Sequence, residues 1–189
     1  KATTTTTTTK ATVVTTSTVA KTTTATTTKA PVTTVSTTGT TVPKTTTTVT
    51  TTTTIPLYEE PTLGLVYRIE EDAVIIVGYK GSGEELAIPS AINGLPVTAI
   101  ANNAFSGQKE LKKLSVPSSV LTIGNSAFSN CTALETVSLA EGVQTIGSSA
   151  FYTCAALTAI VLPDSVIEIG SSCFYGCTSL QSATIGAGL

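Results

Sequence analysis

A 23-residue repeat dominates the second half of this 189-residue chain. Five columns of side chains recur at that spacing without an insertion: Ile100, Ile123, Ile146 and Ile169; Phe105, Phe128, Phe151 and Phe174; Leu111, Leu134, Leu157 and Leu180; Leu114, Val137, Ile160 and Ala183; Val116, Leu139, Leu162 and Ile185. A fixed period of about 20 to 50 residues is typical of solenoids and propellers. Because 23 residues are too few for a four-stranded propeller blade, the period predicts a solenoid.

One repeat is not expected to fold alone. Each buried apolar side chain stabilises by ~1.5–3 kcal/mol, whereas ordering the chain costs roughly 1.5 kcal/mol for every residue. Stacked repeats share their apolar faces and pair their strands at ~4.8 Å, so each copy completes the core of its neighbour.

The first part of each repeat predicts a β-strand. Around Val137 and Leu139 the apolar residues alternate with polar ones, which places these two side chains inward and Thr136 and Ser138 outward. Prolines such as Pro163 follow two of the strands and are expected to end them, since proline lacks the amide donor.

The second part of each repeat predicts a corner and a short helix. In V-x-x-I-G, Val143 and Ile146 point inward and Gly147 allows a tight turn. Ser or Asn follows at 125–126, 148–149 and 171–172, and suits the N-cap of a short helical turn that carries Ala-Phe. We therefore predict a mainly β solenoid with short helical turns.

The repeat pattern I-G-x-x-A-F-x-x-C-x-x-L-x-x-V-x-L-P-x-x-V resembles the treponemal-type, or BspA-like, leucine-rich repeat of bacterial surface proteins. The resemblance covers Val97–Leu189, and the first copy departs from it with Ala101 in place of Gly and Gln108 in place of Cys. It implies a secreted or cell-surface protein whose repeats mediate adhesion to host, matrix or bacterial partners.

Residues 57–96 are expected to form an N-terminal β-hairpin cap on residues 97–189, which hold about four coils. LVYRI (65–69) and AVIIVGY (73–79) flank a turn at Glu70, Glu71 and Asp72, and KGSG (80–83) turns the chain into ELAIP (85–89) as a second hairpin. The acidic turn and the glycine-rich GYKGSG (78–83) are interpreted as solvated turns rather than as an acid/base site or a phosphate loop.

The other end of the repeats is predicted to be open. Leu189 occupies the column of Val97, Val120, Val143 and Val166, so it would be the first core residue of a fifth coil. We expect end-to-end self-association through this uncapped coil.

Residues 1–56 form a Thr-rich segment of low complexity, which cannot build a core and is expected to be disordered. Two interpretations stay open: a plain flexible tether and an O-glycosylated stalk. This segment carries five lysines and no acid, whereas the remainder holds five cations against twelve carboxylates. An acidic domain without a basic stripe argues against nucleic-acid binding, and no apolar run is long enough to span a membrane.

Catalytic, metal and cofactor sites are not expected. The chain has no His, which excludes the Ser-His-Asp and Cys-His nucleophile systems. Cys131, Cys154 and Cys177 form a ladder, and Cys173 replaces an Ala of the repeat. We interpret all four as small buried side chains, with a Cys173–Cys177 disulfide or a metal site as the alternatives.

The outward strand positions are the natural recognition surface of a repeat fold. They are Lys113, Ser115, Thr136, Ser138, Ala159, Val161, Ser182 and Thr184. Tyr152 and Tyr175 lie on the side of the helical turn and either contact a partner or pack in part against the repeats. The function predicted is a non-catalytic protein-binding or adhesion module; the alternative is an accessory or spacer module of a large secreted polysaccharide-degrading enzyme or dockerin-bearing assembly.

Overall fold

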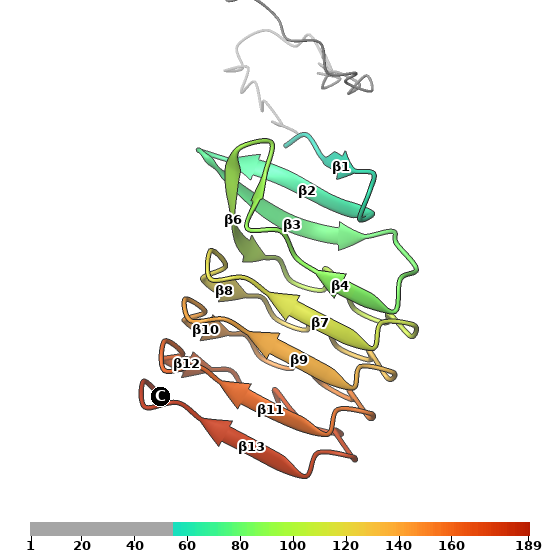
Figure 1. Ribbon diagram of the computed structural model, residues 1–189, viewed down its shortest axis with the longest axis vertical. Coiled ribbons are helices and arrows are strands. Elements are labelled where there is room, and N and C mark those ends of the chain that lie inside the picture. Colours follow the sequence, from blue (N-terminus) through green and yellow to red (C-terminus); the bar gives the residue numbers. More distant parts are fainter. Residues whose placement is uncertain (1–54) are drawn as a thin grey trace, which may run out of the picture. The chain divides into compact units, whose positions relative to one another are not determined.

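The computed structural model describes residues 55–189, in which the chain coils into a β-solenoid (Figure 1). The predicted Thr-rich segment, 1–56, lies outside the described residues apart from Ile55 and Pro56, so its expected disorder and glycosylation stay predictions. The chain begins with β1 (Tyr58–Glu60), β2 (Leu65–Glu70), β3 (Ala73–Tyr79), β4 (Glu85–Ala87), β5 (Ala91–Ile92) and β6 (Leu95–Ile100). The repeats follow as β7 (Lys113–Val116), β8 (Thr122–Ile123), β9 (Thr136–Leu139), β10 (Thr145–Ile146), β11 (Ala159–Leu162), β12 (Glu168–Ile169) and β13 (Ser182–Ile185).

Two sheets run along the solenoid. One has the order β13-β11-β9-β7-β4 and is parallel throughout; the other has the order β1-β2-β3-β6-β8-β10-β12, with β5 paired to β6. Strands pair in the register of the repeat, so Leu114 lies beside Val137 and Thr145 lies beside Glu168. The strand and the second extended segment predicted for each repeat are both confirmed.

The predicted apolar columns form one continuous core. Phe105, Phe128 and Phe151 are fully buried, and their rings stack with centroids 4.9 and 5.3 Å apart. Phe174 continues the stack at 5.6 Å from Phe151. Side chains one repeat apart therefore touch through a common interior, which is the condition for a solenoid.

The short helical turn predicted around Ala-Phe is wrong, because residues 55–189 contain no helix. Alternate amides in this segment bond to two different partners: the Ala127 amide donates to Gly124 O (3.3 Å), but the Phe128 amide donates to Ala150 O of the next coil (2.8 Å). Ser126 adopts a left-handed φ of 54° instead of capping a helix. A helix would direct every amide along its own axis, so the bonds between coils replace it.

The cap confirms one predicted hairpin and corrects the other. Strands β2 and β3 pair antiparallel around the turn at Glu71 and Asp72. The second hairpin is wrong, because β4 does not pair with β3 but joins the parallel sheet beside β7. Strand β3 instead pairs in parallel with β6, so the predicted cap continues both sheets of the repeats.

Gly147 is required for a reason other than a left-handed turn. A Cβ atom at this position would lie 2.6 Å from the backbone nitrogen of Asn125 in the preceding coil, and the equivalent Gly124 and Gly170 meet the same obstacle. The glycine column therefore permits close approach of neighbouring coils at this corner.

Candidate protein-binding face

The parallel sheet presents the predicted outward side chains on one face of the solenoid, which we call the strand face. All eight are exposed: Lys113, Ser115, Thr136, Ser138, Ala159, Val161, Ser182 and Thr184. The intervening residues of β7 and β11, such as Leu114 and Ile160, point into the core and are 3% and 2% exposed. The alternation along β7, β9 and β11 thus fixes a row of mostly small side chains on a packed interior.

A shallow hollow of about 510 Å³ lies over β4, β7 and β9 on this face. Its lining includes Glu85, Lys113, Ser115, Thr136 and Ser138. Lys113 Nζ donates to Glu85 Oε1 at 2.5 Å, so the two longest side chains of the hollow are paired with each other. The remaining exposed groups offer hydroxyls and no unpaired charge.

Two ion pairs between neighbouring coils set the charge distribution around β4 and β7. Glu84 accepts a hydrogen bond from Lys112 at 2.8 Å, in parallel with the pair of Glu85 and Lys113. The hydrogen bond from Lys113 to Glu85, and then their charge attraction, raise the pKa of this lysine above its ordinary value. Both pairs are open to solvent, so they hold their four side chains in position at the edge of the hollow and add little to the stability of the fold.

Strand β4 adds Glu85 and Ala87 to the strand face, and the sequence reasoning missed it. The sequence does contain a signal for this strand, because EELAIPSAI (84–92) is similar to KKLSVPSSV (112–120) at an offset of 28 residues. The same 28 residues separate Glu84 from its ion-pair partner Lys112. The offset exceeds the 23-residue period because an additional hairpin, β5–β6, is inserted around Asn93 and Gly94. Both residues have positive φ, as a two-residue hairpin turn with Asn-Gly demands.

The two tyrosines lie close together but do not belong to the strand face. Tyr152 and Tyr175 come from the turn segments of neighbouring coils, and their rings stack with centroids 5.2 Å apart. Tyr152 is half-buried, while Tyr175 is 65% exposed. Stacking on its neighbour accounts for Tyr152, whereas Tyr175 leaves an aromatic surface open to solvent.

The four cysteines are free, and three of them are buried. The thiols of Cys131, Cys154 and Cys177 each approach the carbonyl of a phenylalanine 26 residues earlier, at 3.1 to 3.3 Å. The neighbouring Cys154 side chain lowers the pKa of Cys177 to about 7, while burial raises the pKa of Cys131 and of Cys173 to about 11. The ladder predicted from the sequence is present, and the structure contains no Cys173–Cys177 disulfide.

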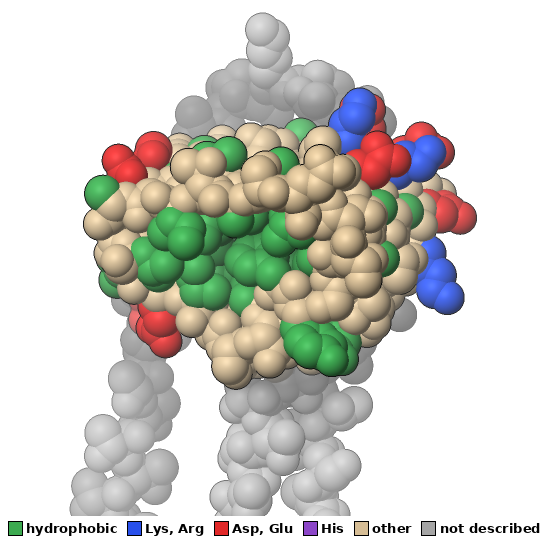
Figure 2. All heavy atoms as spheres, turned by 90° about the horizontal axis from the view of Figure 1, so that it is seen from below, with side chains coloured by type: hydrophobic (Ala, Val, Ile, Leu, Met, Phe, Trp, Pro, Cys, Tyr) green, Lys and Arg blue, Asp and Glu red, His purple; other side chains and the backbone are tan. Residues whose placement is uncertain are grey.

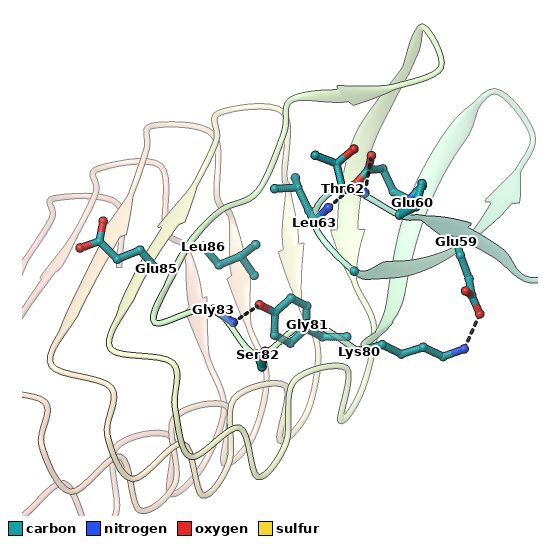
Figure 3. A pocket seen from close by; sticks show the side chains of 13 residues that line it. Glu59, Glu60, Thr62, Leu63, Lys80, Gly81, Ser82, Gly83, Glu85 and Leu86 are labelled. Atoms are coloured by element: carbon teal, nitrogen blue, oxygen red, sulfur yellow. Dashed lines mark hydrogen bonds and ion pairs between the residues drawn. The ribbon is translucent and has the colours of Figure 1, made fainter. Parts of the chain in front are cut away.

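A second hollow, of about 480 Å³, lies in the cap (Figure 3). The ion pair of Lys80 with Glu59 lies on one side, and Glu60 accepts a hydrogen bond from the amide of Leu63 at 2.6 Å. The amide of Gly83 donates to the hydroxyl of Tyr79 at 3.3 Å, a contact within the GYKGSG segment, whose first two residues end β3 and whose last four lie in the loop before β4. These groups satisfy one another and provide no paired nucleophile and base.

Acidic residues at the coil corners bond to backbone. Glu141 accepts from the amides of Asp164 and Ser165 in the next coil, at 3.2 and 3.1 Å. Asp164 in turn accepts from the amide of Ala187 at 2.8 Å. Within residues 55–189, no three His, Cys, Asp or Glu side chains gather into a group that could hold a metal ion. In the same range there is no helix of the length and apolarity needed to cross a membrane.

Comparisons with known proteins agree with the fold. The profile of the BspA type leucine rich repeat region matches residues 98–189 with six copies. A crystal structure of a leucine-rich repeat protein from T. pallidum is 34% identical, with a TM-score of 0.52, and the match covers 68% of this chain and 67% of that one. No curated protein sequence matches the chain.

Two further crystal structures share the architecture. A leucine-rich repeat protein from Bacteroides capillosus is 25% identical over 68% of this chain and 97% of its own, with a TM-score of 0.60. A leucine rich cell surface protein from Faecalibacterium prausnitzii is 23% identical over 72% of this chain and 44% of its own, with a TM-score of 0.57, and shows the fold alone. The repeat pattern, the stacked coils and these matches together establish that the chain belongs to the BspA-type leucine-rich repeat proteins.

Proposed function

We propose that this chain is a non-catalytic protein-binding module of a secreted or cell-surface bacterial protein, and that it binds through the strand face. The observation that carries the proposal is the row of eight exposed, mostly small side chains on a rigid parallel sheet. Repeat proteins bind partners over such extended surfaces, because every coil contributes an equivalent position. The F. prausnitzii protein that shares this fold is a leucine rich cell surface protein.

The small size of the side chains favours a protein partner that supplies the larger ones. Over β4, β7 and β9 the lining of hydroxyls and the Ala87 methyl leaves a hollow of about 510 Å³ that a protruding loop can fill. Lower on the same face Val161 is 59% exposed and provides an apolar contact. An adhesive function follows if that partner is anchored on a host, matrix or bacterial surface.

A matched pair of threonines tests this proposal. Thr136 lies on β9 in the strand face, and Thr122 lies on β8 in the other sheet; both are exposed. We expect the full chain to bind one of a panel of immobilised extracellular-matrix proteins and bacterial surface proteins, measured by surface plasmon resonance. Thr136→Arg should weaken that binding at least tenfold, while Thr122→Arg should leave it unchanged. Equal loss in both variants, or hydrolase activity of the chain, would refute the proposal.

A second interaction is proposed for the last coil, in which the chain self-associates end to end. The last coil exposes Ile185 and Leu189, which continue columns that are buried in the earlier coils. Exposed apolar surface of this kind promotes association. Sedimentation equilibrium of the full chain should show a mass that rises with concentration, and a constant monomer mass would refute this proposal.

A further inference from the structure

The two sheets of the solenoid stop at different places in the cap. One continues beyond β6 through β3, β2 and β1, whereas the parallel sheet stops at β4. Residues 55–84 precede β4 and are all described, so this edge lies within the chain and not at its end. The hollow of about 480 Å³ in the cap borders the edge, and its lining includes Leu86 of β4 and Leu63 of the turn between β1 and β2 (Figure 3). The parallel sheet therefore has a free edge beside an open space.

The free edge of β4 presents backbone donors and acceptors. The carbonyl of Glu84 accepts from two amides at the start of β7, at 2.7 and 3.0 Å, and the amide of Ile88 donates to a carbonyl of β7 at 2.9 Å. Because successive residues of a paired strand direct their backbone groups to alternate sides, those of Glu85 and Ala87 face away from β7. Among residues 55–189 no other strand pairs with β4, and no turn or loop bonds to the amide or carbonyl of Glu85 or Ala87. An added strand would satisfy these groups.

The hollow beside this edge suits an apolar side chain. Leu86 is 3% exposed, and Leu63 and Tyr79 are partly buried and pack against the core. The ring of Tyr79 lies 5.5 Å from that of Phe105, so this wall of the hollow is supported by the repeats. In a strand added to β4, alternate side chains would point toward the interior and enter the hollow.

Charge narrows the chemistry of the added strand. Residues 55–96 contain seven carboxylates and two cations, Arg68 and Lys80. Charged side chains of the described residues lie at the periphery of the solenoid, where a partner in solution meets them (Figure 2). The carboxylate of Glu60, which lines the hollow, accepts from the amides of Thr62 and Leu63, and it forms no ion pair with a described residue. The rim of the hollow therefore attracts lysine or arginine.

We infer that the edge of β4 binds an extended, basic peptide segment of a partner protein, which adds a strand to the parallel sheet. An apolar side chain of that segment enters the hollow, and a lysine or arginine lies near Glu60. Backbone pairing of this kind supplies affinity, while the pocket and the charge supply specificity. The site uses the edge of the sheet, so it goes beyond the binding proposed for the strand face.

Amide exchange measured by NMR on the full chain is the first test. The probe is a synthetic peptide with blocked ends, of sequence KVTVTVK, in which β-branched residues favour an extended strand. In the free chain the amides of Glu85 and Ala87 should exchange fast, and those of Leu86 and Ile88 slowly. Saturating peptide should protect Glu85 and Ala87. Protection of both amides in the free chain would overturn the inference, because another part of the chain would then occupy the edge; fast exchange at saturation would overturn it as well.

Binding of the same peptide, measured by fluorescence anisotropy, distinguishes the edge from other surfaces. Ala87→Pro removes a donor that faces away from β7 and should weaken binding by about tenfold or more, while Ala87→Thr keeps the amide and should bind as the parent does. Equal binding of both variants would overturn the inference. If Ala87→Pro does not fold, the peptide N-methylated at its three central residues tests the same bonds on the parent, and unchanged binding of this peptide would count equally against the inference.

Two further controls separate this site from the strand face and test its charge. Thr136→Arg, which should disrupt the strand face, should leave the affinity for KVTVTVK unchanged. Loss of peptide binding in that variant would overturn the inference but retain the proposed function. The peptide EVTVTVE should bind the parent about tenfold more weakly or worse, because its carboxylates meet the acidic rim. Equal affinity of the two peptides, or no binding of KVTVTVK at millimolar concentration, would overturn the inference.

Discussion

Truncating Phe151 to Ala removes the ring at the centre of the aromatic stack. The side chain is fully buried, with the rings of Phe128 and Phe174 on either side at 5.3 and 5.6 Å. Burial of a phenylalanine and the cavity left by its removal together correspond to ~3–5 kcal/mol, and full burial with two ring contacts places Phe151 in the middle of that range rather than at its lower end. We therefore expect a loss of about 4 kcal/mol in the free energy of unfolding.

The last coil supplies the matched control. Phe174 is only partly buried and has one stacked ring partner, Phe151, so Phe174→Ala should cost roughly half as much, ~2 kcal/mol. For a domain the size of residues 55–189, unfolding entropy of about 2.1 cal/mol/K per residue converts these losses into Tm shifts of roughly 14 and 7 °C.

Urea unfolding and thermal melts of the full chain, followed by circular dichroism, measure both losses. If Phe151→Ala does not fold, Phe151→Leu keeps the site apolar and should cost about 1 kcal/mol, which still permits the comparison with Phe174→Leu. A smaller loss at position 151 than at position 174 would refute the reasoning, because it would mean that neighbouring coils do not share this core.

Two further predictions concern the corner glycines and the cysteines. Gly147→Ala places a Cβ atom 2.6 Å from the backbone nitrogen of Asn125 and should lower the free energy of unfolding, measured in urea, by about 2–3 kcal/mol. A Cβ atom at Gly83 meets nothing nearer than 3.5 Å, so Gly83→Ala should change that free energy by less than about 0.5 kcal/mol. Equal effects of the two substitutions would contradict the close approach of the coils. Iodoacetamide should modify Cys177 first, at a rate that rises with pH to a plateau above its pKa of about 7, because the thiolate is the nucleophile. Cys131 and Cys173, with pKa values raised to about 11, should stay protected at pH 8; mass spectrometry of the digested protein identifies the modified site, and earlier modification of Cys131 would contradict this order.

The period of the sequence was enough to predict the solenoid and its core. The first three residues of each column through Ile123, Phe128 and Leu134 are buried, since a residue that recurs with the coil returns to the same place in it. The exposed positions of the strand face could also be predicted from the sequence, because successive side chains of a strand point to opposite faces of the sheet.

The local conformation of the turn segment could not be predicted in the same way. Asn and Ser before Ala-Phe suit a helix N-cap, but they also tolerate a left-handed φ, and the choice depends on the acceptors that the next coil offers. Here Asn125 Oδ1 accepts from the Ser148 amide at 2.8 Å, a contact between coils that no local propensity contains.

Strand β4 was missed because its repeat is interrupted. The β5–β6 hairpin lengthens the first coil, so a search at a fixed spacing does not align Leu86 with Leu114, although the two pair directly in the sheet. Glu85 and the upper part of the strand face consequently became visible only in the structure.

Hydrogen exchange of single amides tests the central claim, that each coil is hydrogen-bonded to the next through its turn segment. The amides of Phe105, Phe128 and Phe151 donate to carbonyls one coil further on, and NMR should show them exchanging only on global unfolding. The amide of Phe174 should exchange faster by orders of magnitude. Protection that is the same at all four phenylalanines, or absent from all four, would contradict the account.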